Sequence, residues 1–316
     1  MHVLITGAGG FIGSALASRL ALAGTLGQQS LSRLSLVDLG FGQDTPEGGI
    51  VRRHVGDLCN PTWLADVLGD APLHTVFHLA SVPGGAAERD PELGRRVNLE
   101  ATLQLLDRLR LQSHAPRLVF ASTIAVYGEA LPDRVDESTA AVPAMSYGAH
   151  KLAAEILISD AVRRGWVQAC TLRLPGVVAR PGDGAGLVSA FMSRLFWALR
   201  AGESIELPVS ADGTAWWISA QACVDNLLHA AQIEPSRLDG RCVVQMPALH
   251  LSLREVVDAL AQEHGMDRHA LVRYAPRPEV QRLFAAYPPL DTPRALALGF
   301  RHDGSARELA RRAVLR

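Results

Sequence analysis

The sequence predicts an α/β protein, a doubly wound parallel sheet with a smaller C-terminal lobe, and three observations lead to this prediction. Short apolar runs alternate with helical patterns over residues 1–175. The first run stops at closely spaced glycines, which are typical of a tight turn between a strand and a helix. Over residues 176–316 the alternation loosens, and Pro- and Gly-rich links separate the helical patterns. We therefore expect two domains with these ranges and a discontinuous boundary.

Length and composition are those of an ordinary globular protein. The 316 residues can bury a large core, 48% of them are hydrophobic, and the net charge of -1 gives no reason to expect a nucleic acid or a membrane surface as partner. Four cysteines without a C-x-x-C pair predict reduced thiols and a cytoplasmic protein, and no metal site is expected. No apolar stretch reaches about 18 residues, and no basic segment precedes the apolar N-terminus. We expect neither a membrane span nor a signal peptide.

The first apolar run, residues 2–6, ends at glycines in G-x-x-G-x-x-G spacing and changes into a helical pattern. Glycines permit an unusual turn and let the backbone approach a pyrophosphate, for which the helix N-terminus supplies amide donors. We predict a dinucleotide-binding turn that is formed by Gly7, Gly10, Phe11, Ile12 and Gly13. The alternative is a glycine-rich loop that binds no ligand.

The next apolar run, Leu34 to Asp38, ends in a carboxylate. In dinucleotide-binding folds an acidic residue at this place accepts hydrogen bonds from the adenosine ribose and repels a 2′-phosphate. Asp38 therefore favours NAD over NADP, unless it only ends the strand. A third strand is expected over residues 50–55, after which Asp57 and Leu58 are predicted to hold the adenine.

A fourth apolar run, residues 75–80, is followed by Ser-Val-Pro-Gly-Gly. Ligands of open parallel sheets bind beyond the carboxyl ends of the strands. The residues predicted to reach the site from this strand end are Leu79 and Ala80 for the cofactor and Ser81, Gly84 and Gly85 for the substrate. His78 lies inside the run and is expected to be a packed histidine rather than a catalyst.

A long helix is expected over residues 93–109 because an apolar residue recurs at every fourth position. The stripe consists of Leu93, Val97, Ala101, Leu105 and Leu109. Further helical patterns lie near residues 187–199, 223–233 and 253–264, and a sixth strand is expected over residues 167–174.

Two hydroxyl residues, Ser122 and Thr123, follow the apolar run over residues 117–121, so they stand at the ligand end of a strand. Ser122 could equally cap the next turn. Both are nevertheless predicted to contact the substrate.

Tyr147 and Lys151 are spaced i, i+4, so on a helix they share one face and the ammonium can lie near the phenol. A tyrosine that acts as a base near neutral pH needs its pKa lowered by roughly 3 units, about 4 kcal/mol, and a neighbouring ammonium favours the ionised form. Lys151 is the only lysine in the chain, although an exposed lysine on a surface helix is the plain alternative. The helix is expected to bury Leu152, Ala153, Ile156 and Leu157.

The chain resembles the extended short-chain dehydrogenase/reductase family, also called the NAD-dependent epimerase/dehydratase family. The resemblance lies in residues 6–13, in Ser122, and in Tyr147 with Lys151. The resemblance implies a Rossmann domain, bound NAD, and Tyr147 as general acid/base. It also implies that Lys151 holds the nicotinamide ribose and lowers the tyrosine pKa, and that Ser122 positions the substrate oxygen. Homodimers paired through the long helices are implied as well.

Within that family the chain most resembles enzymes that oxidise a four-carbon sugar acid at C2, in residues 81–88, 216–230 and 297–300. Nucleotide-sugar 4-epimerases usually carry an arginine for the diphosphate where this chain has residues 214–221, which contain none. We therefore expect an NAD-dependent dehydrogenase of a small sugar acid, with the C-terminal lobe binding the substrate. Arg173 and Arg180 are candidates for its carboxylate, and Arg180 is the predicted contact. A 4-epimerase and a non-catalytic dinucleotide sensor are the alternatives.

Overall fold

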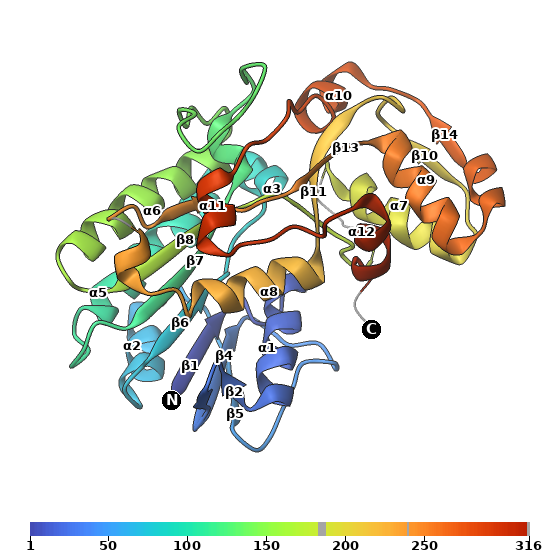
Figure 1. The fold of residues 1–316 in the computed structure, drawn as a ribbon. Coiled ribbons are helices and arrows are strands. Elements are labelled where there is room, and N and C mark those ends of the chain that lie inside the picture. The colour runs from blue at the N-terminus through green and yellow to red at the C-terminus, as the bar shows by residue number, and fades with distance from the viewer. Residues whose placement is uncertain (183–187, 239, 315–316) are drawn as a thin grey trace. The chain divides into compact units, whose positions relative to one another are not determined.

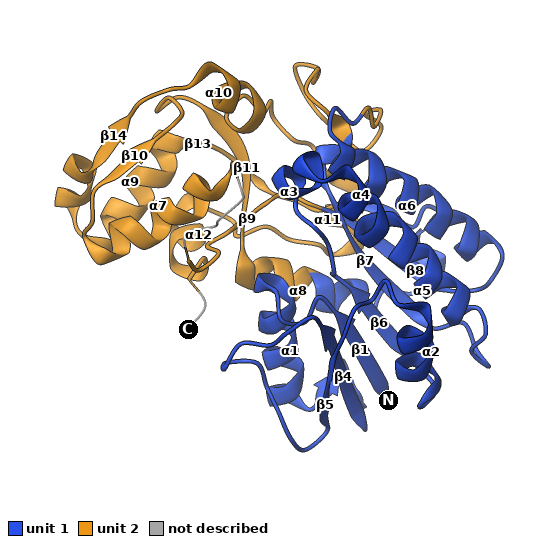
Figure 2. Cartoon of the chain, turned by 180° about the vertical axis from the view of Figure 1, so that it is seen from behind, with its two compact units in different colours: residues 1–126, 143–173, 227–244 blue, residues 127–142, 174–226, 245–316 orange. Residues whose placement is uncertain are grey.

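The computed structural model describes residues 1–182, 188–238 and 240–314, and these divide into two compact units (Figure 2). Unit 1 comprises residues 1–126, 143–173 and 227–244. Unit 2 comprises residues 127–142, 174–226 and 245–316. That the N-terminal part binds NAD and the C-terminal part binds substrate stays a prediction.

The sheet of unit 1 has seven strands in the order β12-β8-β7-β6-β1-β4-β5 (Figure 1). The strands are β1 (His2–Thr6), β4 (Arg33–Asp38), β5 (Val51–Val55), β6 (Thr75–His78), β7 (Arg117–Thr123), β8 (Gln168–Leu174) and β12 (Val243–Gln245). β1 pairs in parallel with β4 on one side and with β6 on the other. The chain therefore extends the sheet from β1 through β4 to β5, and then crosses back to β6. The predicted α/β fold is confirmed, and the order of the strands reverses between β1 and β6, the place at which open sheets of this kind bind their ligands.

Helices cover both faces of this sheet, as the alternation of buried side chains along β1 requires. They are α1 (Phe11–Ala23), α2 (Pro61–Gly69), α3 (Gly84–Arg89), α4 (Pro91–Arg95), α5 (Ala101–Leu109) and α6 (Ser146–Arg163). Leu4 points to a core that α2, α5 and α6 share, whereas α1 packs on β1 and β4 from the other face. Asn60 caps α2 by accepting hydrogen bonds from the amides of Thr62 and Trp63. A short hairpin of β2 (Thr25–Leu26) and β3 (Gln29–Ser30) follows α1.

The predicted helix over residues 93–109 is not regular, because a π-helical turn, η1 (Arg96–Glu100), joins α4 to α5. A π-helical turn contains one more residue than an α-turn and so rotates the exposed face. Gly94 and Asn98 are buried before this shift, where the apolar stripe predicted Leu93 and Val97. After it, Ala101, Leu105 and Leu109 are buried as predicted.

The buried face of α6 also differs from the prediction. The helix buries Gly148, Lys151, Ala154, Glu155, Ile158 and Ala161. Ile156 is 63% exposed and Leu157 is 40% exposed, so the expected burial of these two residues was wrong. Lys151 and Glu155, spaced i, i+4, lie on the buried face instead, next to the positions that were predicted to be buried.

Unit 2 contains small sheets and helices around a second core. Its strands are β9 (Gly176–Val178), β11 (Thr214–Ser219) and β13 (Leu249–Ser252) in one sheet, and β10 (Ile205–Leu207) and β14 (Val272–Tyr274) in another. Its helices are α7 (Ala190–Ala201), α9 (Leu253–His264), α10 (Pro278–Phe284), α11 (Pro293–Leu298) and α12 (Ala306–Arg312), and α8 (Ala220–Ala230) begins in it. The 3-10 turn η4 (Met266–Leu271) belongs to unit 2, η3 (Pro235–Leu238) belongs to unit 1, and η2 (Ile124–Tyr127) lies at the boundary between the two. Residue 187, where the sequence predicted a helix to start, lies outside the described residues.

Candidate functional site

The turn between β1 and α1 is so tight that a Cβ at three of its glycines, Gly7, Gly9 and Gly13, would meet backbone atoms. Gly7 has a φ of +72°, and a Cβ there would lie 2.6 Å from the amide nitrogen of Ala80. A Cβ on Gly13 would lie 2.0 Å from the carbonyl oxygen of Gly7. At Gly7 the turn thus lies against the backbone of Leu79 and Ala80, just after β6, and the first turn of α1 lies against Gly7. Amides of a helix N-terminus lack intrahelical acceptors, which fits a bound pyrophosphate.

Asp38 is held at the end of β4 by two backbone amides. Gly9 donates to Oδ2 over 2.8 Å and Leu39 donates to Oδ1 over 2.7 Å, so the carboxylate is fixed beside the glycine turn. Each carboxylate oxygen can accept a further hydrogen bond. This placement fits a residue that holds a ribose, and the turn and Asp38 together fit NAD.

The two residues predicted to hold the adenine follow β5. The carboxylate of Asp57 accepts a hydrogen bond from the amide of Cys59 over 2.9 Å, whereas the Leu58 side chain is buried. The role of both residues stays a prediction.

Asn98, which the sequence did not single out, holds the segment after β6 in place. Its Oδ1 accepts from the Ser81 hydroxyl over 3.0 Å and from the Val82 amide over 2.8 Å, and its Nδ2 donates to the Val82 carbonyl over 3.0 Å. Asn98 is completely buried in η1. The signal in the sequence was a polar residue inside an apolar helix, and the π-helical turn explains why it points inward.

His78 is a packed histidine, as predicted. Its Nδ1 lies 2.6 Å from the Thr6 hydroxyl and its Nε2 lies 2.9 Å from the Thr102 hydroxyl. Burial lowers the pKa of His78 to about 3, with Lys151 contributing in the same direction. The imidazole is therefore neutral and already has two partners, which leaves it no role in proton transfer.

Lys151 is buried rather than exposed, which excludes the surface-helix alternative. It is 1% exposed, its ammonium donates to the carbonyl of Ala121 over 2.8 Å, and it lies 4.6 Å from the centre of the Phe120 ring. Burial lowers the pKa of Lys151 to about 7, while the charge of Glu155 acts to raise it. Tyr147 lies one helical turn before it and is partly exposed.

Gly84, after β6, lies beside Met145 and Tyr147 at the start of α6. A Cβ on Gly84 would lie 3.8 Å from the Tyr147 ring and 3.0 Å from Cε of Met145. Gly84 and Gly85 form the first turn of α3, so this turn packs beside the start of α6.

The hydroxyls of Ser122 and Thr123 have different partners. Ser122 donates its hydroxyl to Glu155 over 2.5 Å and is 1% exposed. The Thr123 hydroxyl accepts from the amide of Ala125 over 3.1 Å, and Thr123 is 9% exposed. Because successive side chains of a strand point to opposite sides, only one of these hydroxyls can face a given ligand.

The two arginines considered for a carboxylate lie in different units. Arg173 forms an ion pair with Glu155 over 2.7 Å and is 13% exposed at its side chain. Arg180 belongs to unit 2 and is exposed; the Ser193 hydroxyl accepts from its amide over 3.0 Å, and its carbonyl accepts from the Trp197 indole over 2.8 Å. Arg180 as the substrate contact stays a prediction.

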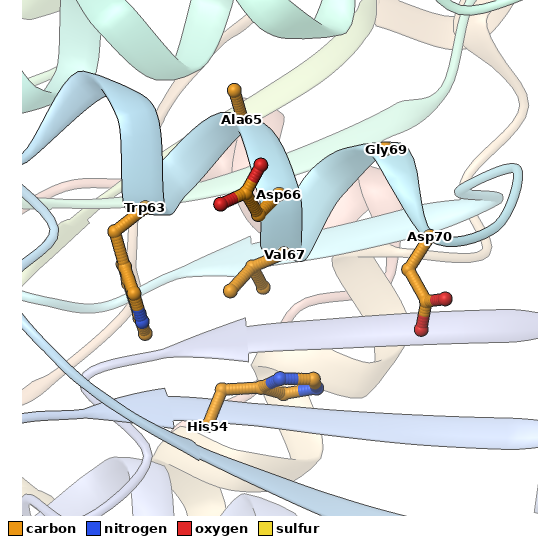
Figure 3. Close-up of a pocket in the computed structure, with 7 residues that line it drawn as sticks. All are labelled: His54, Trp63, Ala65, Asp66, Val67, Gly69 and Asp70. Carbon is orange, nitrogen blue, oxygen red and sulfur yellow. The ribbon is translucent and has the colours of Figure 1, made fainter.

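An open pocket on unit 1 lies beside β5 and α2 (Figure 3). Its lining includes His54, Trp63, Asp66 and Asp70 and none of the predicted site residues. Asp70 forms an ion pair with Arg33, so its charge is already compensated. Among the described residues, no group of three His, Cys, Asp or Glu side chains is arranged to hold a metal ion. None of the helices described is both long and apolar enough to cross a membrane.

Comparisons with known proteins identify the family of the chain. The model of the NAD dependent epimerase/dehydratase family matches residues 3–237. A D-erythronate dehydrogenase of Cupriavidus necator is 38% identical, covering 98% of this chain and 97% of the relative, and one of Haemophilus influenzae is 30% identical, covering 96% of each. The crystal structure of a nucleoside-diphosphate-sugar epimerase from Agrobacterium tumefaciens superposes with a TM-score of 0.92 at 32% identity, covering 98% of this chain and 92% of that one.

A Rossmann-type sheet with a glycine turn and a Tyr-x-x-x-Lys helix defines a class of NAD-dependent oxidoreductases and epimerases. The chain belongs to the NAD-dependent epimerase/dehydratase family.

Proposed function

We propose that the protein is an NAD-dependent dehydrogenase that oxidises a small sugar acid at a secondary hydroxyl, with D-erythronate oxidised at C2 as the leading candidate. The observation on which the chemistry depends is the buried Lys151 one helical turn after Tyr147. The substrate class is supported by the similarity to two D-erythronate dehydrogenases over nearly the whole chain.

Tyr147 is the proposed base. A cation beside a phenol favours the phenolate, so a charged Lys151 lowers the pKa of Tyr147 and prepares it to take the hydroxyl proton. NAD, when bound, accepts the hydride from the substrate carbon that carries this hydroxyl. Asp38 favours NAD over NADP because its carboxylate would repel a 2′-phosphate.

The oxygen of the substrate would be held by a hydroxyl at the end of β7. Ser122 and Thr123 were both predicted for this role, and the hydrogen bond from Ser122 to Glu155 favours Thr123. Ser81, Gly84 and Gly85 are further proposed contacts, and Arg180 is the proposed partner of the carboxylate. A homodimer is the proposed assembly, and the exposure of Ile156 and Leu157 on α6 supports it.

The test is a panel of four-carbon sugar acids with NAD and with NADP, followed by the absorbance of the reduced cofactor. We expect reduction with NAD and an acid that carries a free C2 hydroxyl. Tyr147→Phe should abolish turnover and leave NAD affinity nearly unchanged, because the substitution removes only the hydroxyl. Turnover that survives in Tyr147→Phe would remove Tyr147 from the proposed role.

A nucleotide-sugar 4-epimerase is the second candidate, because the Agrobacterium tumefaciens structure is 32% identical. An epimerase returns the hydride to its substrate and gives no net reduction of NAD. Interconversion of nucleotide sugars without reduced cofactor, and no oxidation of any acid on the panel, would favour that reading.

A further inference from the structure

A buried cluster of charged and polar groups lies beneath the end of β7, and the activity proposed above makes no use of its acid. Glu155 of α6 is 3% exposed at its side chain. Its Oε1 accepts from the Ser122 hydroxyl of β7 over 2.5 Å and from Nε of Arg173 of β8 over 3.0 Å. Its Oε2 accepts from Nη2 of Arg173 over 2.7 Å. Three adjacent elements of unit 1 thus fix one carboxylate.

Lys151 lies one helical turn before Glu155, on the same buried face of α6. Its ammonium contacts the Ala121 carbonyl and the Phe120 ring of β7. The neutral His78 of β6 and Glu155 interact with it electrostatically. Tyr147 lies one turn before it on α6, and Arg173 of β8 reaches this region through Glu155. Glu155 is the negative group among them.

Burying an ammonium favours its neutral form, because a low-dielectric interior solvates the charge poorly. A fixed carboxylate nearby opposes this effect, provided that the carboxylate itself stays ionised. The Arg173 guanidinium forms an ion pair with the Glu155 carboxylate, and the Ser122 hydroxyl donates a hydrogen bond to it.

We propose that Glu155 is a positioning residue that serves as the counter-ion of Lys151, with Ser122 and Arg173 holding its carboxylate in place. The inference rests on the proposed function in one respect, since a charged Lys151 matters only if Tyr147 acts as the base. Ser122 then acts through Glu155 rather than by contacting the substrate.

The single lysine of the chain allows a direct measurement. Protein that is labelled with 13C and 15N in lysine alone gives one side-chain signal, that of Lys151, whose chemical shift can be followed against pH in the whole protein without substrate. For Glu155→Gln we expect the midpoint of this titration to fall by about one pH unit or more, because one nearby negative charge is lost.

Glu137→Gln is the matched control. Glu137 of unit 2 accepts hydrogen bonds from the amides of Arg294 and Ala295, so its loss weakens a structural contact away from Lys151 in the sequence and in the other unit. The Lys151 midpoint should stay at its wild-type value in this variant. If Glu155→Gln does not fold, the double variant Glu155→Gln/Arg173→Gln is compared with Arg173→Gln, and its Lys151 midpoint should be the lower of the two because only the charge at residue 155 differs between them.

An unchanged midpoint in Glu155→Gln, or equal midpoints in the double variant and Arg173→Gln, overturns the proposal, as does an equal shift in Glu137→Gln. The titration and the substrate panel fail independently. A lowered midpoint with no acid oxidised would support Glu155 as counter-ion and reject the dehydrogenase activity. An oxidised acid with an unchanged midpoint would support the dehydrogenase activity and reject Glu155 as counter-ion.

Discussion

At the scale of residues, sequence spacing decides which side chains share a helix face, and burial decides the protonation state of those side chains. The i, i+4 spacing of Tyr147 and Lys151 is visible in the sequence, whereas the state of the ammonium depends on the groups that bury it. The two hydroxyl residues at the end of β7 also differ only in their tertiary contacts. Ser122 and Thr123 are equivalent candidates in the sequence, and the partner on α6 distinguishes them.

A paired substitution separates these hydroxyls. Thr123→Val removes a hydroxyl while keeping the shape, and we expect kcat to fall by roughly a hundredfold, in the range of a lost transition-state hydrogen bond. Ser122→Ala should cost about tenfold or less, since it acts only through Glu155. Steady-state kinetics of both variants on the acid that the panel identifies makes the comparison, and a larger loss in Ser122→Ala would return the substrate contact to Ser122.

At the scale of elements, the β1–α1 turn shows how the spacing of glycines in the sequence predicts a tight backbone turn. The glycine spacing was recognisable because the turn is local in sequence, and the close approach of Gly13 to Gly7 explains why it consists of glycines. The buried face of the helix over residues 93–109 was harder to predict. A single π-helical turn rotates this face, and the spacing of the apolar residues in the sequence does not reveal the turn.

Gly13→Ala tests this turn. The added Cβ would meet the Gly7 carbonyl oxygen at 2.0 Å, so the backbone must move and the amides of the turn must move with it. We expect NAD to bind at least about tenfold more weakly, which is roughly 1.4 kcal/mol, by isothermal titration calorimetry. Gly40→Ala is the control, since a Cβ there meets no atom within 4 Å. Equal affinity of both variants would contradict a pyrophosphate at this turn.

At the scale of the whole molecule, buried neutral histidines in the sheet make stability depend on pH. Burial lowers the pKa of His78 to about 3 and of His2 to about 4, from an ordinary value of 6.5. The unfolded chain therefore takes up protons on these rings that the folded chain excludes. Their contribution to stability is fully present above pH 6.5 and is lost as the pH falls toward 3.

We expect the free energy of unfolding, measured with urea, to fall as the pH decreases from 6.5 to 4, and to fall less steeply in His78→Gln. The variant should also be less stable at pH 7, because Thr6 and Thr102 lose a well-placed partner. A slope in His78→Gln that equals the wild-type slope would mean that carboxylates alone cause the acid sensitivity.

The sequence by itself determined the α/β class, the order of the main strands and helices, the glycine turn and the spacing of Tyr147 and Lys151. Each of these is a local property, because a strand, a turn or one face of a helix is encoded within a few consecutive residues. Only the tertiary structure decided that Lys151 and Glu155 point inward on α6, that Ser122 turns toward Glu155, and that Asn98 holds the segment after β6. Such contacts join residues that are distant in the chain, and the free energy of burying a charge depends on all the elements that pack around it.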